Sequence, residues 1–197
     1  LLVVLHCAFT MSFESLFPVL SRDQLGFQAG IELYKGGSLL MIGVGTGALG
    51  AALGLAAVEN QRFRGRLFLI LGLLSGVTPL LLGLSPKPSL AMLAAVGVGF
   101  SQGGFMTLST AMVQQLVPDA VRGRVMAVYS WHTQGFMAGA NFLNGVLVDI
   151  SWLNAPRVLG GTGVIFVVIM VASLLRSPLR QIYRRGISVE ARATQTE

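Results

Sequence analysis

The sequence predicts an all-α membrane protein, and three observations support that fold class. Of the 197 residues, 53% are apolar and only 11% are charged, whereas about a quarter of the residues in a soluble domain carry a charge. The mean hydropathy is +0.72. Long neutral stretches separate the charged residues, and each is long enough to cross a bilayer as a helix. This composition argues against a soluble enzyme and against a nucleic-acid-binding domain.

Six transmembrane helices are expected in order along the chain, because hydrocarbon leaves open backbone groups without partners and so favours helices over strands. Their ranges are about 1–20, 36–58, 67–85, 89–116, 125–149 and 159–175. They form one bundle over 1–178, and a basic tail at 179–197 is expected to be disordered in the cytoplasm. The single cysteine, Cys7, excludes an internal disulfide and a cysteine-rich metal site. Since the chain opens without Met, we expect it to be a piece of a longer protein.

Lys and Arg orient the connecting loops, because cytoplasmic loops are enriched in both residues. The loops after the second and fourth expected helices, together with the tail, hold 10 basic residues, against 4 in the other three loops. Both termini are therefore expected to be cytoplasmic.

The first expected helix carries His6, Thr10 and Glu14 at intervals of four, which would place them on one face. A carboxylate within a span normally faces the bundle interior or a wet cavity and is a functional hypothesis. The alternative is a carboxyl group that is solvated or neutralised near the outer interface. His6 is expected to reach the headgroups at the other end. An aromatic stripe adjoins this face at Phe9, Phe13 and Phe17.

The second expected helix is a packing helix, since small residues at intervals of three and four let another helix approach closely. These residues are Gly43, Gly47, Gly50 and Gly54. The third and sixth helices, 67–85 and 159–175, contain no amide, histidine or charged side chain and are therefore expected to face lipid.

Polar side chains distinguish the fourth and fifth expected helices. Gln102 lies near the middle of 89–116 among glycines, and one seam of 125–149 carries Ser130, Gln134, Asn141 and Asn144. Such groups need partners on another helix, in water or in a substrate. His132, close to the end of the same helix, is interpreted as a packing or interfacial residue.

The helices thus read polar, glycine-rich, apolar, then polar, polar, apolar. Two triplets with the same order of roles predict a structural repeat of three plus three. Because three is odd, the second triplet must be inverted in the membrane.

Between about Phe9 and Pro178 the sequence resembles the C-terminal half of a major facilitator superfamily transporter, in particular the bacterial drug and siderophore efflux type. Three stretches carry the resemblance: 33–36 with 45–50, Gly54 with 62–66, and 117–126. The second of them lacks the family's Asp-Arg pair, and Glu59 is only a nearby acid. The loop residues concerned are Arg62, Arg64, Gly65, Arg66, Asp119, Arg122, Gly123 and Arg124.

The resemblance implies a secondary transporter of small molecules in the bacterial inner membrane, driven by protons and completed by an N-terminal six-helix half. It implies no enzymatic activity, cofactor, metal or nucleic-acid partner. In the family the first helix of each triplet lines the cavity and the third faces lipid. The expected substrate and proton pathway comprises Glu14, Thr10, Phe13, Phe17, Gln102, Gln134 and Asn141.

Two other functions remain open. A noncatalytic membrane assembly subunit would fit the six helices and their glycine faces. A six-helix intramembrane protease would need a Ser nucleophile in a Gly-x-Ser-Gly context and a His base. The nearest match runs from Gly99 to Gln102, with Gln in place of the final Gly, and the sixth helix has no His.

Overall fold

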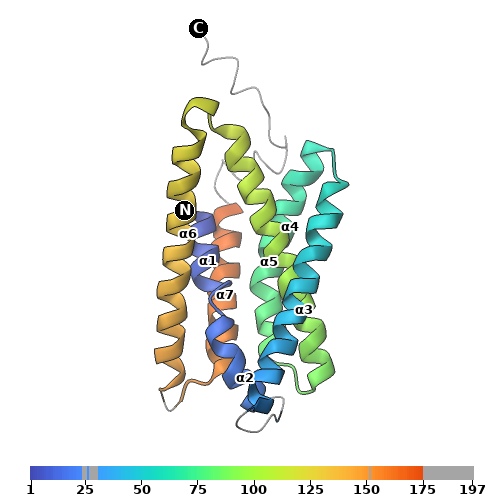
Figure 1. Ribbon diagram of the computed structural model, residues 1–197, viewed down its shortest axis with the longest axis vertical. Helices are drawn as coiled ribbons and strands as arrows, with labels where there is room; N and C mark the ends of the chain where they lie inside the picture. The colour runs from blue at the N-terminus through green and yellow to red at the C-terminus, as the bar shows by residue number, and fades with distance from the viewer. Residues whose placement is uncertain (24–25, 27–30, 151, 175–197) are drawn as a thin grey trace.

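A computed structural model describes residues 1–23, 26, 31–150 and 152–174, and these residues form helices and turns without a strand. The elements are α1 (Leu2–Phe9), the 3-10 turn η1 (Glu14–Leu16), α2 (Phe17–Asp23), α3 (Ile31–Ala56), α4 (Gln61–Gly83), α5 (Pro88–Leu116), α6 (Asp119–Val148) and α7 (Ala155–Leu174). The all-α fold class is therefore confirmed. The long helices run roughly parallel to one axis (Figure 1).

Five segments of the described chain are long and apolar enough to cross a membrane: Leu2–Arg22, Lys35–Ala56, Arg62–Gly83, Pro88–Leu116 and Ala155–Leu174. The first comprises α1, η1 and α2. Helix α6 has 30 residues and the required length, but it is not among the five segments. Its amide, hydroxyl, histidine and glycine residues make it less apolar than the other long helices. That α6 also crosses the membrane, which would complete the six expected spans, consequently stays a prediction.

Helices α3, α4, α6 and α7 begin four to six residues before the expected positions, because the charged residues at the ends of the neutral stretches are themselves helical. Helix α4 begins beside Asn60, whose Oδ1 accepts hydrogen bonds from the backbone N–H groups of Arg62 and Phe63. Helix α6 begins at Asp119, an acid that suits the positive end of the helix dipole. Charge thus indicates where a span meets water, while capping groups decide where the helix begins.

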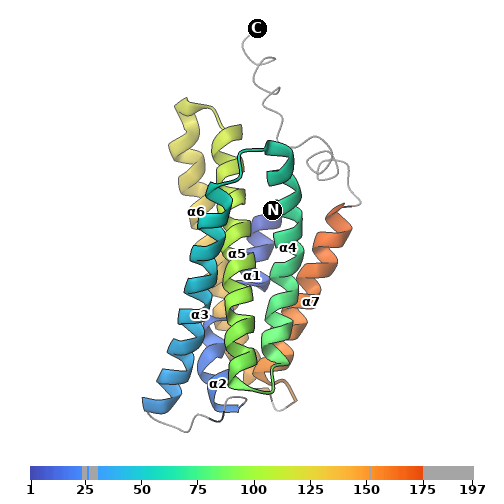
Figure 2. The same cartoon turned by 90° about the vertical axis from the view of Figure 1, so that its right-hand side faces the viewer.

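The helices pack in a continuous series of neighbours. Helix α5 lies between α3 and α4, α4 packs in turn against α7, and α1 lies between α7 and α6 (Figures 1 and 2). The connections α3–α4 and α5–α6 lie at one end of the bundle, and α4–α5 and α6–α7 lie at the other. Residues 59–66 and 118–124 therefore share one end, as the distribution of basic residues predicts.

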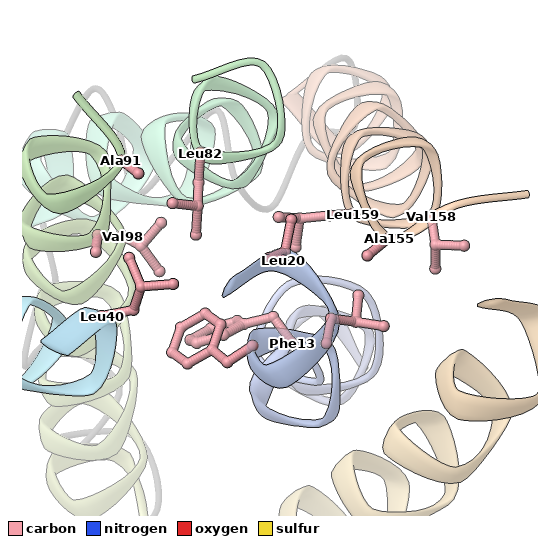
Figure 3. Close-up of a cluster of buried hydrophobic side chains, with 12 residues drawn as sticks. Phe13, Leu20, Leu40, Leu82, Ala91, Val98, Ala155, Val158 and Leu159 are labelled. Atoms are coloured by element: carbon pink, nitrogen blue, oxygen red, sulfur yellow. The ribbon is translucent and has the colours of Figure 1, made fainter. Parts of the chain in front are cut away.

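The main apolar core joins the lower part of the first span to four other helices. Phe13, Leu16, Phe17 and Leu20 are buried there against α3, α4, α5 and α7. Figure 3 labels Phe13 and Leu20 within this cluster. The side chains supplied by the other helices are Leu40, Leu82, Ala91, Ala95, Val98, Ala155, Val158 and Leu159. Burial of these side chains fixes residues 13–20 of the first span against the bundle.

Helices α3 and α5 touch through glycines. A Cβ atom on Gly47 would overlap the carbonyl oxygen of Val96, and one on Gly99 would overlap that of Val44. Gly43 also faces α5, where a Cβ would meet Ala95 at 3.1 Å. Gly50 has room for a Cβ in ordinary contact, and Gly54 faces open space. Only the first half of the predicted glycine face therefore holds the two backbones together.

The structure corrects the expectation that α4 and α7 simply face lipid. The two helices pack against each other at glycines, since a Cβ on Gly163 would overlap the carbonyl oxygen of Gly76. Within its span 56% of α4 is buried, the largest share among the five candidate spans. Only one stripe is exposed, including Ile70, Leu74, Val77 and Leu81. Apolar composition alone does not distinguish a lipid-facing side chain from one that contacts another apolar helix.

We predict that Gly99→Ala destabilises the bundle, because the added methyl group must push α3 and α5 apart. The expected loss is about 1–3 kcal/mol, the usual cost of overpacking, measured as the free energy of unfolding in a detergent titration. The matched control is Gly45→Ala, where a Cβ meets nothing within 4 Å. Equal stability of Gly99→Ala and the control would contradict the close α3–α5 contact.

We also predict that positions 59 and 87 lie on opposite sides of the membrane, because they occupy opposite ends of α4. Single cysteines at Glu59 and Lys87, in a variant without Cys7, should react with a membrane-impermeant maleimide from opposite faces of the vesicle. The residue at position 59 should react from the cytoplasmic side, where Lys and Arg accumulate. Labelling of both positions from one side would refute this topology.

Candidate functional site

The first span is interrupted between its two helical parts. Helix α1 ends at Phe9, and residues 10–13 form turns before η1. The side chains of Thr10 and Ser12 donate hydrogen bonds to the carbonyl oxygens of His6 (2.8 Å) and Ala8 (2.6 Å). Hydroxyl groups that bond local carbonyls in this way compete with the helix ladder. Pro18 then stands in the first turn of α2, where its missing N–H is tolerated.

Amide side chains from two other helices bond the backbone exposed by this interruption. Gln102 on α5 donates from Nε2 to the carbonyl oxygen of Thr10 at 2.6 Å. Asn144 on α6 donates from Nδ2 to the carbonyl oxygen of Ser12, and also to the Ser12 hydroxyl at 3.0 Å. Both amides are almost fully buried.

A third amide reaches the same region. The backbone N–H of Ser15 donates to Oδ1 of Asn141 at 3.4 Å, a long and weak bond. The structure thus brings three of the amides singled out in the sequence to one place. Gln134, which belongs to the same predicted seam, is exposed about two turns from Asn141 and three from Asn144 on α6.

The interruption also separates the residues that an unbroken helix would align. Thr10 is buried at 2% exposure and His6 at 0%, whereas Glu14 is exposed on η1. The expected single face of His6, Thr10 and Glu14 is therefore wrong, because the turns at 10–13 change the direction in which the later side chains point. No spacing rule for a regular helix applies across such a break.

The aromatic stripe of the first span is divided in a similar way. Phe13 and Phe17 lie 5.1 Å apart, between ring centroids, inside the core. Phe9 is half-buried and lines a surface groove. Phe13 and Phe17 therefore anchor the segment that follows the interruption in the apolar core.

His6 does not reach the headgroups as expected. Its ring lies 4.3 Å from that of Phe105 and 5.1 Å from that of Phe166, measured between centroids. Neither ring nitrogen has a hydrogen-bond partner among the described residues. The imidazole is packed as an aromatic ring among α1, α5 and α7. No local sequence pattern predicts this contact, because both neighbouring rings come from helices distant in the chain.

A groove of about 720 Å³ runs between α1 and α6 beside the interruption. Its lining residues are Ala8, Phe9, Trp131, His132, Gly135, Phe136, Gly139, Ala140 and Leu143. A Cβ built on Gly135 or Gly139 would meet no other described helix within 4 Å. This glycine pair therefore leaves open space, whereas Gly47 and Gly99 lie in close backbone contacts. The groove can accept an apolar or aromatic group.

His132 is the polar side chain at this groove, a role that the sequence interpretation did not assign to it. Its Nδ1 lies 2.8 Å from the carbonyl oxygen of Val128. A carbonyl only accepts, so Nδ1 carries the proton and Nε2 of the neutral ring is an acceptor. The perpendicular ring of Trp131 lies 5.2 Å away. In the sequence, the one feature that indicates a role for His132 at the groove is the position of the Trp131–His132 pair one turn before Gly135.

Residues 119–124, expected in a loop, form the first turns of α6 and tie α5 to it. Arg122 forms an ion pair with Asp119 and donates to the carbonyl oxygens of Gln114 (3.1 Å) and Val117 (3.4 Å). Gly123 and Arg124 are exposed. Arg122 therefore fixes the turn between the two helices.

Residues 62–66, also expected in a loop, form the first turns of α4. Nε of Arg64 donates to the carbonyl oxygen of Val58 at 2.7 Å, which holds the α3–α4 turn. Gly65 is buried, while Arg62 and Arg66 are exposed beside a second pocket.

The Ser of the protease-like motif has ordinary structural partners. Ser101 lies 3.0 Å from the hydroxyl of Thr78 on α4 and also bonds the carbonyl oxygen of Gly97. The contact with Thr78 links α4 to α5.

Comparison with known proteins supports a membrane transporter. No curated protein and no solved structure matches the chain. One family model, described as transmembrane secretion effector and of the major facilitator superfamily type, matches residues 2–193. This match covers nearly the whole chain, together with five candidate membrane spans. The chain therefore belongs to the transmembrane secretion effector family of major facilitator superfamily membrane transporters.

Proposed function

We propose that the chain is the C-terminal half of a proton-coupled carrier that exports small amphiphilic molecules across the bacterial inner membrane by alternating access. The observation that carries this proposal is the interrupted first span, whose carbonyl groups at Thr10 and Ser12 are bonded by Gln102 and Asn144. Irregular backbone inside a membrane is tolerated where it is buried in protein or lines a cavity. Secondary transporters commonly place their binding sites at such discontinuities.

The groove between α1 and α6 would provide the apolar part of the solute pathway. It adjoins the interruption, because Gly139, Ala140 and Leu143 line it and Asn141 meets Ser15. Gln134 would supply a polar contact from the exposed side of α6. Phe13 and Phe17 would enter the pathway only when the segment around Thr10 moves, since both rings are buried behind it.

Matched helix contacts support the proposed inverted repeat of two triplets. Helix α3 packs on α5 as α6 packs on α1, and α4 packs on α5 as α7 packs on α1. A two-fold relation that exchanges the first span with α5, α3 with α6, and α4 with α7 would produce these pairs. In this arrangement α6 would also cross the membrane, which completes six spans. The exposed face of α6 would meet the partner half.

Glu14 would be the proton-coupling residue. It lies within the candidate span Leu2–Arg22 and is exposed on the surface of the described bundle. A carboxyl group in that position needs water or a protein neighbour, since lipid is a costly environment for it. A wet cavity between this bundle and an N-terminal half would provide both.

We predict that Glu14→Gln abolishes proton-driven transport in the complete transporter, because the amide keeps the shape of the side chain and cannot carry a proton. Uptake of a fluorescent amphiphile into inverted vesicles, driven by an imposed pH gradient, should fall at least tenfold, in line with the usual contribution of a positioned proton-transfer group. Equilibrium binding of an uncharged ligand should largely survive.

The matched control is Asp149→Asn, which removes an exposed acid at the C-terminal end of α6. This variant should transport at the normal rate. Normal transport by Glu14→Gln, with an unchanged pH profile, would show that Glu14 is structural and that coupling resides elsewhere.

We further predict that Gln102→Leu loosens the interruption without unfolding the bundle. Loss of the bond to the Thr10 carbonyl leaves a buried acceptor unpaired, which costs about 1–3 kcal/mol. Hydrogen exchange of the amides at 10–16, followed by mass spectrometry, should accelerate by roughly tenfold or more.

Gln134→Leu serves as the control for this experiment, because Gln134 is exposed and its loss leaves residues 10–16 untouched. Exchange of the α5 amides should remain slow in both variants. Unchanged exchange at 10–16 in Gln102→Leu would mean that the amide does not hold the interrupted segment.

A further inference from the structure

A second pocket, away from the interruption, lies at the turn between α3 and α4. It has a volume of about 520 Å³ and is lined by Ala57, Val58, Glu59, Asn60, Arg62, Phe63 and Arg66. The turn is held in shape from two sides. Asn60 caps the start of α4, and Arg64 bonds the Val58 carbonyl at 2.7 Å. The pocket is therefore a defined feature of the fold.

The pocket lies at the level where hydrocarbon meets water. One candidate span ends at Ala56 and the next begins at Arg62, so the lining residues occupy the boundary of both. Exposed apolar side chains adjoin the pocket: Phe63, which itself lines it, is 48% exposed, and Leu53, one turn before the end of α3, is 66% exposed. A molecule bound here would have its polar part in the pocket and its apolar part along the outside of α3 and α4.

The charges in the pocket favour an anion. Two guanidinium groups, on Arg62 and Arg66, line it against one carboxylate, on Glu59. Guanidinium groups bind phosphate oxygens in a bidentate way and hold phosphates more specifically than a single ammonium does. Basic pockets between membrane helices are suited to anionic lipid headgroups.

We propose that this pocket binds the phosphodiester headgroup of an anionic phospholipid, with Arg62 and Arg66 on the phosphate and the acyl chains against Leu53 and Phe63. Glu59 disfavours additional negative charge and limits the site to one phosphate. The site is separate from the proposed transport pathway, so it stands whether or not the chain couples transport to protons.

The test is lipid binding to the purified full chain in detergent, followed by native mass spectrometry during titration with phosphatidylglycerol or phosphatidylcholine. The unmodified chain should retain one phosphatidylglycerol in preference to phosphatidylcholine. Arg62→Gln should weaken that binding roughly fivefold, the usual effect of one basic residue at a charged lipid surface. Glu59→Gln should tighten it, a gain that damaged folding cannot produce.

Arg124→Gln is the matched control, because Arg124 is an exposed basic residue at the same end of the bundle and outside the pocket. It should bind the lipid normally. Equal weakening by Arg124→Gln would show diffuse attraction and overturn the proposal. So would displacement of the lipid by millimolar inorganic phosphate, which indicates a free-anion site, or weaker binding in Glu59→Gln, which indicates a zwitterionic headgroup.

Discussion

Inside hydrocarbon every backbone N–H and C=O group needs a partner within the protein, and the interruption at residues 10–13 makes this requirement acute. The carbonyl groups of Thr10 and Ser12 have lost their places in the helix ladder, and buried amides from α5 and α6 bond them instead. Gln102 and Asn144 therefore satisfy carbonyl groups of a helix other than their own. The first span, α5 and α6 form one interdependent unit around that break.

Glycine determines how closely the remaining helices approach. Gly47 and Gly99 bring the backbones of α3 and α5 together, and Gly76 and Gly163 do the same for α4 and α7. Helices α3, α5, α4 and α7 consequently form a tightly packed set. The glycine pair of α6 faces the groove. Helix α6 is therefore attached mainly through its contacts with α1 and through the hydrogen bonds of its Asn141 and Asn144 side chains. The two sides of the bundle thus differ in packing although their helix pairs match.

Charged side chains act at the ends of the bundle and hold its turns. Arg122 joins the end of α5 to the start of α6, and Arg64 holds the turn between α3 and α4. These contacts use the guanidinium group as a donor to backbone carbonyls as well as a charge. Arg62 and Arg66 line the pocket at the same turn, where we propose that they meet lipid phosphate. Arginines in similar sequence settings therefore serve different purposes.

The sequence by itself determined the all-α membrane class, the approximate positions of five candidate spans and the family, because these depend on hydropathy, charge positions and local motifs. Only the tertiary structure decided that the first span breaks after Phe9, which buries His6 and leaves Glu14 exposed. Helical spacing assumes an unbroken helix, whereas the break is stabilised by side chains about 90 and 130 residues away along the chain. Likewise, the sequence of an apolar helix such as α4 has the same pattern whether lipid or α7 covers its surface. Burial is set by neighbours that are distant in sequence.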